Sequence, residues 1–248
     1  MSGHSHYATI KRQKETKDAA KGRVFSKLAR AIQIAVKSGG GSDPDSNYKL
    51  RMTIDTARSF NMPKDNIERA IRAAETKLGD LEEVTYEGYG PGGIAIILEA
   101  VTDNRNRTGQ EIKNIFDRGG GSLAGPGSVS FNFESKGLIL VEKKDNFEEA
   151  MLPLIDLGVE DINETDDAIE VYTDPTKLGV IRDNLGSLEF KVKTVEIMNK
   201  PKNFQLIEDA DLAKKILSFL DNLEAHEDVQ KVSTNLDIPQ VVLEKIGS

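Results

Sequence analysis

The side chains best suited to chemistry lie near the start of the chain, and that chemistry is the binding of a polyanion. Across 22–37, GRVFSKLARAIQIAVK, apolar residues recur at helical spacing on one face and cations on the opposite face. Such a helix packs inward and offers cations outward, so phosphate groups are its natural partner. A solvated helix face that binds nothing is the alternative. The predicted nucleic-acid-binding residues are Tyr7, Lys11, Arg12, Lys14, Lys17, Lys21, Arg23, Lys27, Arg30 and Lys37.

A second pair of cations, Arg105 and Arg107, lies in the segment TDNRNRT at 102–108. Thr108 and Glu111 fit the S/T-x-x-E capping box, which predicts that a helix opens there. The two arginines would then lie beside the free amides of a helix N-terminus, where an anion is favoured. A polar turn whose arginines pair with local acids is equally compatible with the segment. The sequence therefore predicts a second anion site and leaves this alternative open.

The sequence lacks the residues that several kinds of catalytic or metal site need. The chain has no cysteine, which excludes a disulfide framework, a thiolate metal site and a cysteine nucleophile. His4 and His6 form an H-x-H pair, but the third histidine, His226, is far away in sequence, so no metal site is predicted. The glycines of 119–127 follow a predicted helix, precede a predicted strand and lack the G-x-x-x-x-G-K-[ST] pattern of a phosphate loop. We expect no cofactor.

Charge is divided unevenly along the 248 residues, whose net charge is −8. Residues 1–77 contain 16 Lys and Arg against 8 Asp and Glu, a net charge of +8, and subtraction from the totals of 33 and 41 leaves 17 and 33, a net charge of −16, for 78–248. The nucleic-acid footprint therefore belongs to the first third, and the acidic remainder should be repelled by phosphate except where local arginines intervene. No run approaches about 18 apolar residues, and no signal-peptide core is present. We expect a cytoplasmic protein without membrane contact.

Three amphipathic helices are predicted at 22–37, 48–60 and 63–78, with a flexible connector at 38–47. After these helices the spacing of apolar residues changes from the helical period of about 3.6 residues towards a period of two, which marks a domain boundary. Two strands joined by a tight glycine turn then form a hairpin, followed by the helix after Thr108 and a further strand. The ranges of these later elements are 85–88 and 94–101 for the hairpin, 90–93 for its turn and 128–133 for the strand.

From Lys136 onward a β-α-β-β-α-β alternation predicts a ferredoxin-like domain. The tail reads as a strand at 204–207, a helix at 212–223 and a strand at 229–232, and we infer that it returns to complete the middle domain. Short connections at 134–137 and 198–203 make an insertion plausible. The predicted fold class is α+β, with a three-helix domain followed by two ferredoxin-like α/β domains, one inserted in the other. Their ranges are 1–78 for the helical domain, 79–134 plus 203–248 for the discontinuous domain and 135–202 for the inserted one.

Six motifs in order give the whole chain a specific resemblance to the YebC/PmpR family. They are GHSHYATIK at 3–11, NMPKDNIERAI at 61–71, YEGYGPGG at 86–93, TDNRNRT at 102–108, GGSLAGPGSVSF at 120–131 and DVQKVSTNL at 228–236. The resemblance implies a three-domain architecture, one domain helical and two α/β. It also implies a role either as a DNA-binding transcriptional regulator or as a translation factor on stalled ribosomes. One departure is that His6 and Tyr7 stand where the family usually has Lys-Trp.

A helix-turn-helix reader would place its recognition helix after a tight turn, whereas here the basic helix comes first and a glycine-rich loop follows. This order favours recognition of phosphates and shape, which suits structured RNA. We therefore predict a non-enzymatic nucleic-acid-binding regulator that binds ribosomal RNA and the ribosome, with promoter DNA as the alternative. An enzyme using Asp103 and a protein-docking module are the rival classes, and the oligomeric state is left open.

Overall fold

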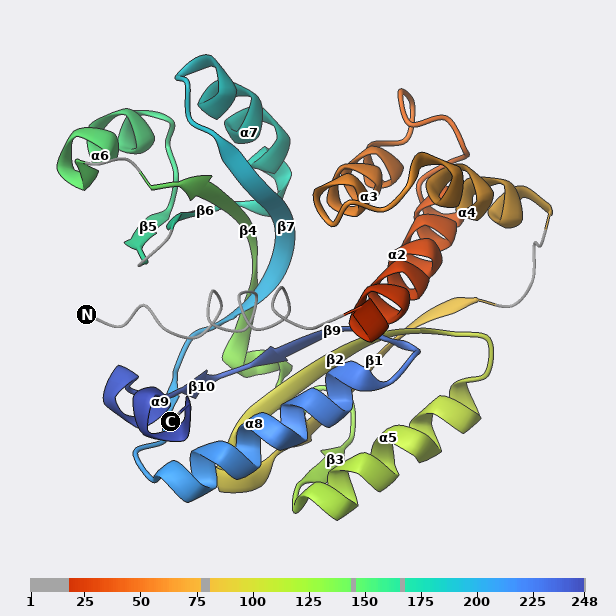
Figure 1. Cartoon of the computed structure of the whole chain (residues 1–248), viewed down its shortest axis with the longest axis vertical. Coiled ribbons are helices and arrows are strands. Elements are labelled where there is room, and N and C mark those ends of the chain that lie inside the picture. Colours follow the sequence, from red (N-terminus) through yellow and green to blue (C-terminus); the bar gives the residue numbers. More distant parts are fainter. Residues whose placement is uncertain (1–17, 77–80, 144–145, 166–167, 248) are drawn as a thin grey trace.

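The computed structural model describes residues 18–76, 81–143, 146–165 and 168–247, which form a helical domain and two four-stranded antiparallel sheets with helices packed on them (Figure 1). The helical domain contains α2 (Asp18–Ser38), α3 (Tyr48–Ser59) and α4 (Lys64–Thr76). This confirms the three predicted helices. Their apolar faces share one core, whose buried members are Ile32, Ala35, Val36, Leu50, Ile54, Ala57, Met62, Ile67 and Ala70.

Asn47 anchors the connection between α2 and α3. Its side chain is buried, and its Oδ1 accepts a hydrogen bond from the N–H of Leu50, which caps α3. Its Nδ2 donates to the carbonyl oxygens of Ala35 at 2.8 Å and Gly41 at 2.7 Å. One amide side chain thus ties the end of the predicted connector to both helices.

The first sheet has the strand order β3-β1-β2-β9. Strands β1 (Glu82–Tyr89) and β2 (Ala95–Thr102) form the predicted hairpin, and the 3-10 turn between them is Pro91–Gly93. β3 (Ser122–Ala124) pairs with β1, while β9 (Val229–Thr234) returns from near the end of the chain to pair with β2.

Helices α5 (Arg105–Gly119) and α8 (Ala210–Ala225) pack side by side on the first sheet (Figure 1). The rings of Phe116 and Phe219 meet edge to face between them, with centroids 5.3 Å apart. The buried stripe of each helix follows from its apolar spacing, which for α8 is Ala213, Ile216, Phe219, Leu220 and Leu223.

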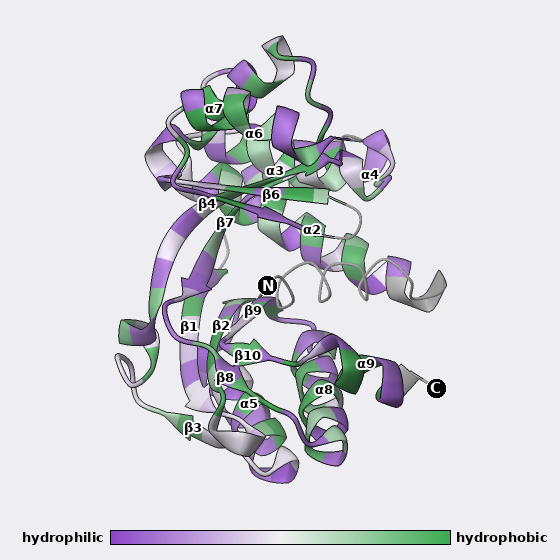
Figure 2. Cartoon of the chain, turned by 90° about the vertical axis from the view of Figure 1, so that its left-hand side faces the viewer, coloured by the Kyte–Doolittle hydropathy of each residue, from purple (hydrophilic) through white to green (hydrophobic). Residues whose placement is uncertain are grey.

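The second sheet has the strand order β5-β6-β4-β7, and α6 (Phe147–Asp156) and α7 (Leu178–Ser187) share its main core. Figure 2 shows the two sheets in separate lobes joined by β4 and β7. The bounds of the strands are β4 (Phe133–Glu142), β5 (Asp161–Glu164), β6 (Ala168–Thr173) and β7 (Val192–Pro201).

Two predictions fail where the sheets join. β4 and β7 pair continuously from Phe133 opposite Pro201 to Val141 opposite Val192, with one irregularity in register. The lobes are therefore connected by a two-stranded ribbon and not by short connections at 134–137 and 198–203. The predicted strand at 128–133 is also wrong, because a 3-10 turn at Ser130–Asn132 precedes β4.

The end of the chain adds a small layer beside the first sheet. The predicted strand at 204–207 is shortened to β8 (Gln205–Leu206), which pairs in parallel with β10 (Leu236–Asp237) outside the main sheet. A further helix, α9 (Gln240–Gly247), was not predicted, and it packs on α8. No helix among the described residues is long and apolar enough to cross a membrane.

Candidate nucleic-acid interface

The cations predicted for α2 differ in what they touch. Arg23 is exposed, whereas Lys27 is half-buried and its Nζ donates to the carbonyl oxygen of Glu224 in the last turn of α8. Lys37 is exposed, and its Nζ donates to the carbonyl oxygen of Leu81 at 3.1 Å. Lys21 is exposed and also has an interaction partner. The remaining predicted residues lie outside the described part of the chain, namely Tyr7, Lys11, Arg12, Lys14 and Lys17.

Burial changes the acidity of Lys27. It lowers the pKa of the ammonium group from 10.5 to about 8, because the charged form loses solvation, and the attraction of Glu224 offsets only part of this effect. The side chain of Lys27 therefore serves to dock α2 on the body of the protein. Its predicted contact with phosphate stays a prediction.

Asp228 is the carboxylate on which the two predicted sites converge. Its side chain is only 3% exposed and pairs through Oδ1 with Arg30 of α2. Oδ2 accepts hydrogen bonds from Nη2 of Arg107 at 2.8 Å and from the hydroxyl of Thr108 at 2.6 Å. Burial alone would raise the pKa of Asp228, but the hydrogen bonds from Thr108, Arg107 and Arg30 outweigh it and lower the pKa. Asp228 thus stays charged and joins α2 to α5.

The start of α5 corrects the predicted capping box. Asn104 caps the helix, because its side chain accepts from the N–H of Arg107, and α5 begins at Arg105. Thr108 lies within the first turns, buried, with its hydroxyl 2.8 Å from that of Thr102. The capping box fails because the Thr108 oxygen is engaged in tertiary contacts and an asparagine one turn earlier can cap instead.

The two arginines of the predicted second site lie in this first turn, and both are exposed. Arg107 contacts Asp103 at 3.0 Å as well as Asp228, so the alternative of pairing with local acids describes this residue. Arg105 offers its carbonyl oxygen to the hydroxyl of Tyr86 at 3.2 Å. Whether either arginine binds an anion remains a prediction.

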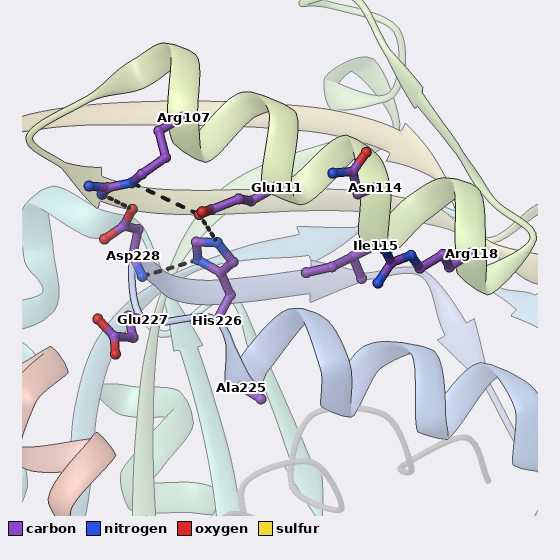
Figure 3. A pocket seen from close by; sticks show the side chains of 9 residues that line it. All are labelled: Arg107, Glu111, Asn114, Ile115, Arg118, Ala225, His226, Glu227 and Asp228. Carbon is purple, nitrogen blue, oxygen red and sulfur yellow. Dashed lines mark hydrogen bonds and ion pairs between the residues drawn. The ribbon is translucent and has the colours of Figure 1, made fainter.

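A pocket of about 590 Å³ lies between α5 and the turn that links α8 to β9 (Figure 3). The guanidinium group of Arg107 and the imidazole of His226 meet Glu111 and Asp228 at one end, while Arg118 lies towards the other (Figure 3). The full lining is Arg107, Glu111, Asn114, Ile115, Arg118, Ala225, His226, Glu227 and Asp228.

Three of these side chains resemble a metal site by type, because ligand atoms of Glu111, His226 and Asp228 lie within 4.8 Å of one another. The contacts do not fit a metal ion. The Nδ1 of His226 accepts the N–H of Asp228 at 3.2 Å, and its Nε2 faces Glu111 at 3.0 Å. Arg107 lies 2.8 Å from Asp228 and 4.0 Å from Glu111, so a guanidinium group already supplies the positive charge.

The glycine-rich segment after α5 is held by a buried carboxylate. Glu87 of β1 accepts hydrogen bonds from the N–H groups of Gly127, Val129 and Ser130 at 2.8, 2.8 and 2.9 Å. Burial would raise the pKa of Glu87, but these backbone hydrogen bonds lower it. Donors that a phosphate loop would offer to its ligand are thus satisfied within the protein.

Sequence reasoning missed Asp228 and Glu87. Asp228 pairs with residues 198 and 121 positions away, and Glu87 accepts from residues 40 to 43 positions away. Glu87 lies within the predicted strand at 85–88, and Asp228 directly precedes the one at 229–232, next to Glu227. Neither has a local pattern that distinguishes it from the other acids of the chain. The one available signal for Asp228 was its place at the head of the motif DVQKVSTNL.

In a comparison with known proteins, the chain matches two models of one family. A model described as the TACO1/YebC protein N-terminal domain matches residues 5–77, and one described as the TACO1/YebC second and third domain matches 81–236. A "probable transcriptional regulatory protein" of Dictyoglomus turgidum is 45% identical over 251 residues and covers 100% of both chains. One from Sulfurihydrogenibium is 45% identical over 250 residues, with 99% of each covered. The crystal structure of a conserved hypothetical protein from Aquifex aeolicus has a TM-score of 0.83 at 41% identity, over 90% of this chain and 93% of that one.

Proposed function

The chain belongs to the TACO1/YebC family, and from that premise we propose that it regulates gene expression by binding the phosphate backbone of a nucleic acid. Relatives that match it over their full length are named as probable transcriptional regulators, and such a name describes regulation and not catalysis. The protein is accordingly a regulator and not an enzyme.

One observation carries the proposal, namely the meeting of α2 and α5 at Asp228. α2 contains five cations and one acid, a net charge of +4, and α5 contains four cations and two acids, a net charge of +2. Because Arg30 and Arg107 bind the same carboxylate, the two basic helices are held together at Asp228, and each keeps an exposed arginine, Arg23 in α2 and Arg105 in α5. The exposed acids Asp103, Glu111 and Glu227 lie at the junction, so the cations on either side of it are the ones available to a polyanion.

Duplex DNA is the first ligand to test, because the relatives' names refer to transcription. The ribosome is the second candidate. It is favoured by the nine-residue connection 39–47 between α2 and α3, which separates the basic helix from its neighbour by more than the tight turn of a helix-turn-helix reader.

The variant that tests the proposal reverses the charges of Arg23 and Arg105, which are exposed in α2 and α5. Arg23→Glu with Arg105→Glu should weaken binding to a random-sequence DNA duplex by about tenfold or more at low salt. The slope of log K against log salt should become shallower by about 0.9 for each lost contact. Lys27 and Arg30 are avoided because they hold α2 on the body of the protein.

The matched control is Lys177→Glu, a charge reversal of an exposed lysine in the lobe of the second sheet, which should leave affinity within about twofold. Co-sedimentation with ribosomes, using the same variants, tests the second candidate. If the double variant binds both DNA and ribosomes as tightly as the wild type, this surface is not the interface.

A further inference from the structure

The solvent-facing side of α5 carries an unusual stripe of amides. Asn106, Gln110 and Asn114 recur at intervals of four, so they lie on one face of the helix, and all three are exposed. The buried face is formed by Thr108, Ile112 and Phe116. We call Asn106, Gln110 and Asn114 the amide stripe.

Helix propensity does not account for the two asparagines of the stripe. Asparagine within a helix is less favourable than alanine, lysine or glutamate, because its side chain competes for backbone hydrogen bonds. Gln110 is an ordinary helix former, and its hydrogen bond to Asn114 one turn later adds a small stabilisation. Most exposed positions of α4 show the usual solution, which is charged residues; these are Lys64, Asp65, Arg69, Arg72 and Glu75, and Thr76 is the exception. At Asn106 and Asn114, recognition of a ligand therefore explains the residue type better than folding does.

Two members of the stripe are already oriented by each other. Nε2 of Gln110 donates to Oδ1 of Asn114 at 3.0 Å. This bond leaves an acceptor on Gln110 and donor hydrogens on Asn114 directed to other partners. A donor beside an acceptor is the pattern that adenine complements in the major groove, through its N7 acceptor and N6 donor.

Exposed cations lie at both ends of the stripe. Arg105 lies at the start of α5 and Arg118 near its end, whereas Arg107 is held by Asp228. Lys113 is exposed between them, and the exposed acids of the helix are Glu111 and Asp117. The net charge of +2 for α5 is the highest of any described helix after residue 81. Phosphate contacts fix register and orientation, while groups on the helix face that enters the groove reach base edges.

We propose that α5 is a sequence-reading helix that inserts its amide stripe into the major groove of duplex DNA, with adenine as the preferred base. This inference rests on the proposed function and specifies its ligand. The major groove of B-DNA is about 12 Å wide and admits an α-helix, whereas that of an RNA duplex is too narrow for side chains to read. Double-stranded DNA is therefore the ligand that we propose for the amide stripe.

The test is selection from a random-sequence DNA duplex library with the full chain and with the variant Asn106→Ala, Gln110→Ala, Asn114→Ala. Alanine is the best helix former, so the variant should fold. The wild type should enrich an adenine-containing motif and bind it at least about tenfold more tightly than random duplex. The variant should lose that preference and keep the affinity for random duplex within about twofold.

Asn222→Ala is the matched control, because it removes an exposed amide from the neighbouring helix α8, and it should enrich the same motif as the wild type. Enrichment of an unchanged motif by the triple variant overturns the inference. So does a wild type that binds duplex DNA without enriching any motif, although the proposed function then stands. A wild type that binds ribosomes but not DNA overturns the inference and favours the second candidate function.

Discussion

The helices α2 and α5 both bring cations to Asp228, but they differ in which of their cations contact the body of the protein and which remain exposed. In α2 the middle cations, Lys27 and Arg30, point to the body of the protein and contact Glu224 and Asp228. In α5 one arginine, Arg107, has that role, and the rest of the polar face lies in solvent. The net charge of a helix therefore indicates the kind of partner it suits, but not which of its cations remain available to that partner.

The largest expected effect comes from removing the carboxylate that joins the two helices. Asp228→Ala leaves Arg30, Arg107 and the buried hydroxyl of Thr108 without their shared acceptor. The two arginines are 29% and 44% exposed and regain water, so the cost is that of lost hydrogen bonds to a charged acceptor, and urea denaturation should show a destabilisation of roughly 2–3 kcal/mol. Glu227→Ala is the control, since Glu227 is 83% exposed and lies 3.6 Å from Arg30. Equal stability of the two variants would mean that the junction does not hold α2.

The next largest effect is expected from the burial of Lys27, and it is measured as a dependence of stability on pH. Burial lowers the pKa of Lys27 to about 8, whereas the unfolded chain has the ordinary value of 10.5. The unfolded state therefore binds more protons between about pH 8 and 10.5, and this group makes stability rise with pH across that window. The difference in unfolding free energy between wild type and Lys27→Met should change by roughly 1–3 kcal/mol over the same range. Parallel stability curves would contradict the buried position of the ammonium group.

A smaller effect is expected when the residue that caps α5 is mutated, compared with mutation of an exposed residue in the same helix. Asn104→Ala removes the side chain that accepts from the N–H of Arg107, and loss of such a cap costs about 1 kcal/mol. Asn106→Ala, two residues later and exposed, should change the unfolding free energy by less than about 0.5 kcal/mol. Thermal or urea denaturation of the two variants side by side measures the difference, and a larger loss for Asn106→Ala would mean that it caps α5.

The smallest effects are expected at the outward positions of both helices. Arg23→Met and Asn114→Ala should each shift the unfolding free energy by less than about 0.5 kcal/mol, with Asn114→Ala on the stabilising side because alanine favours the helix. Arg23→Met should nevertheless weaken binding to random-sequence duplex DNA, whereas Asn114→Ala should weaken only the preference for the adenine-containing motif. A loss of stability above about 1 kcal/mol at either position would place that residue with Lys27 and Arg30 as part of the fold.

The prediction of elements succeeded where periodicity was long and local. The three helices of the first domain and the β1–β2 hairpin are confirmed, because apolar spacing and turn residues act over a few positions. The strand predicted at 128–133 failed for a tertiary reason. Its alternating pattern looks extended, but Glu87 binds the N–H groups of Val129 and Ser130 and holds them in a turn.

The sequence by itself determined the uneven distribution of charge, the amphipathic helices and the family, since all of these depend on residue type and order. The tertiary structure alone decided which cations face inward. Arg30 and Arg107 are 77 positions apart by their numbers, and they meet because β9 returns to the first sheet and places Asp228 between α2 and α5. A buried carboxylate must collect nearby donors to offset its lost hydration, whatever their separation in sequence. No local pattern carries that information.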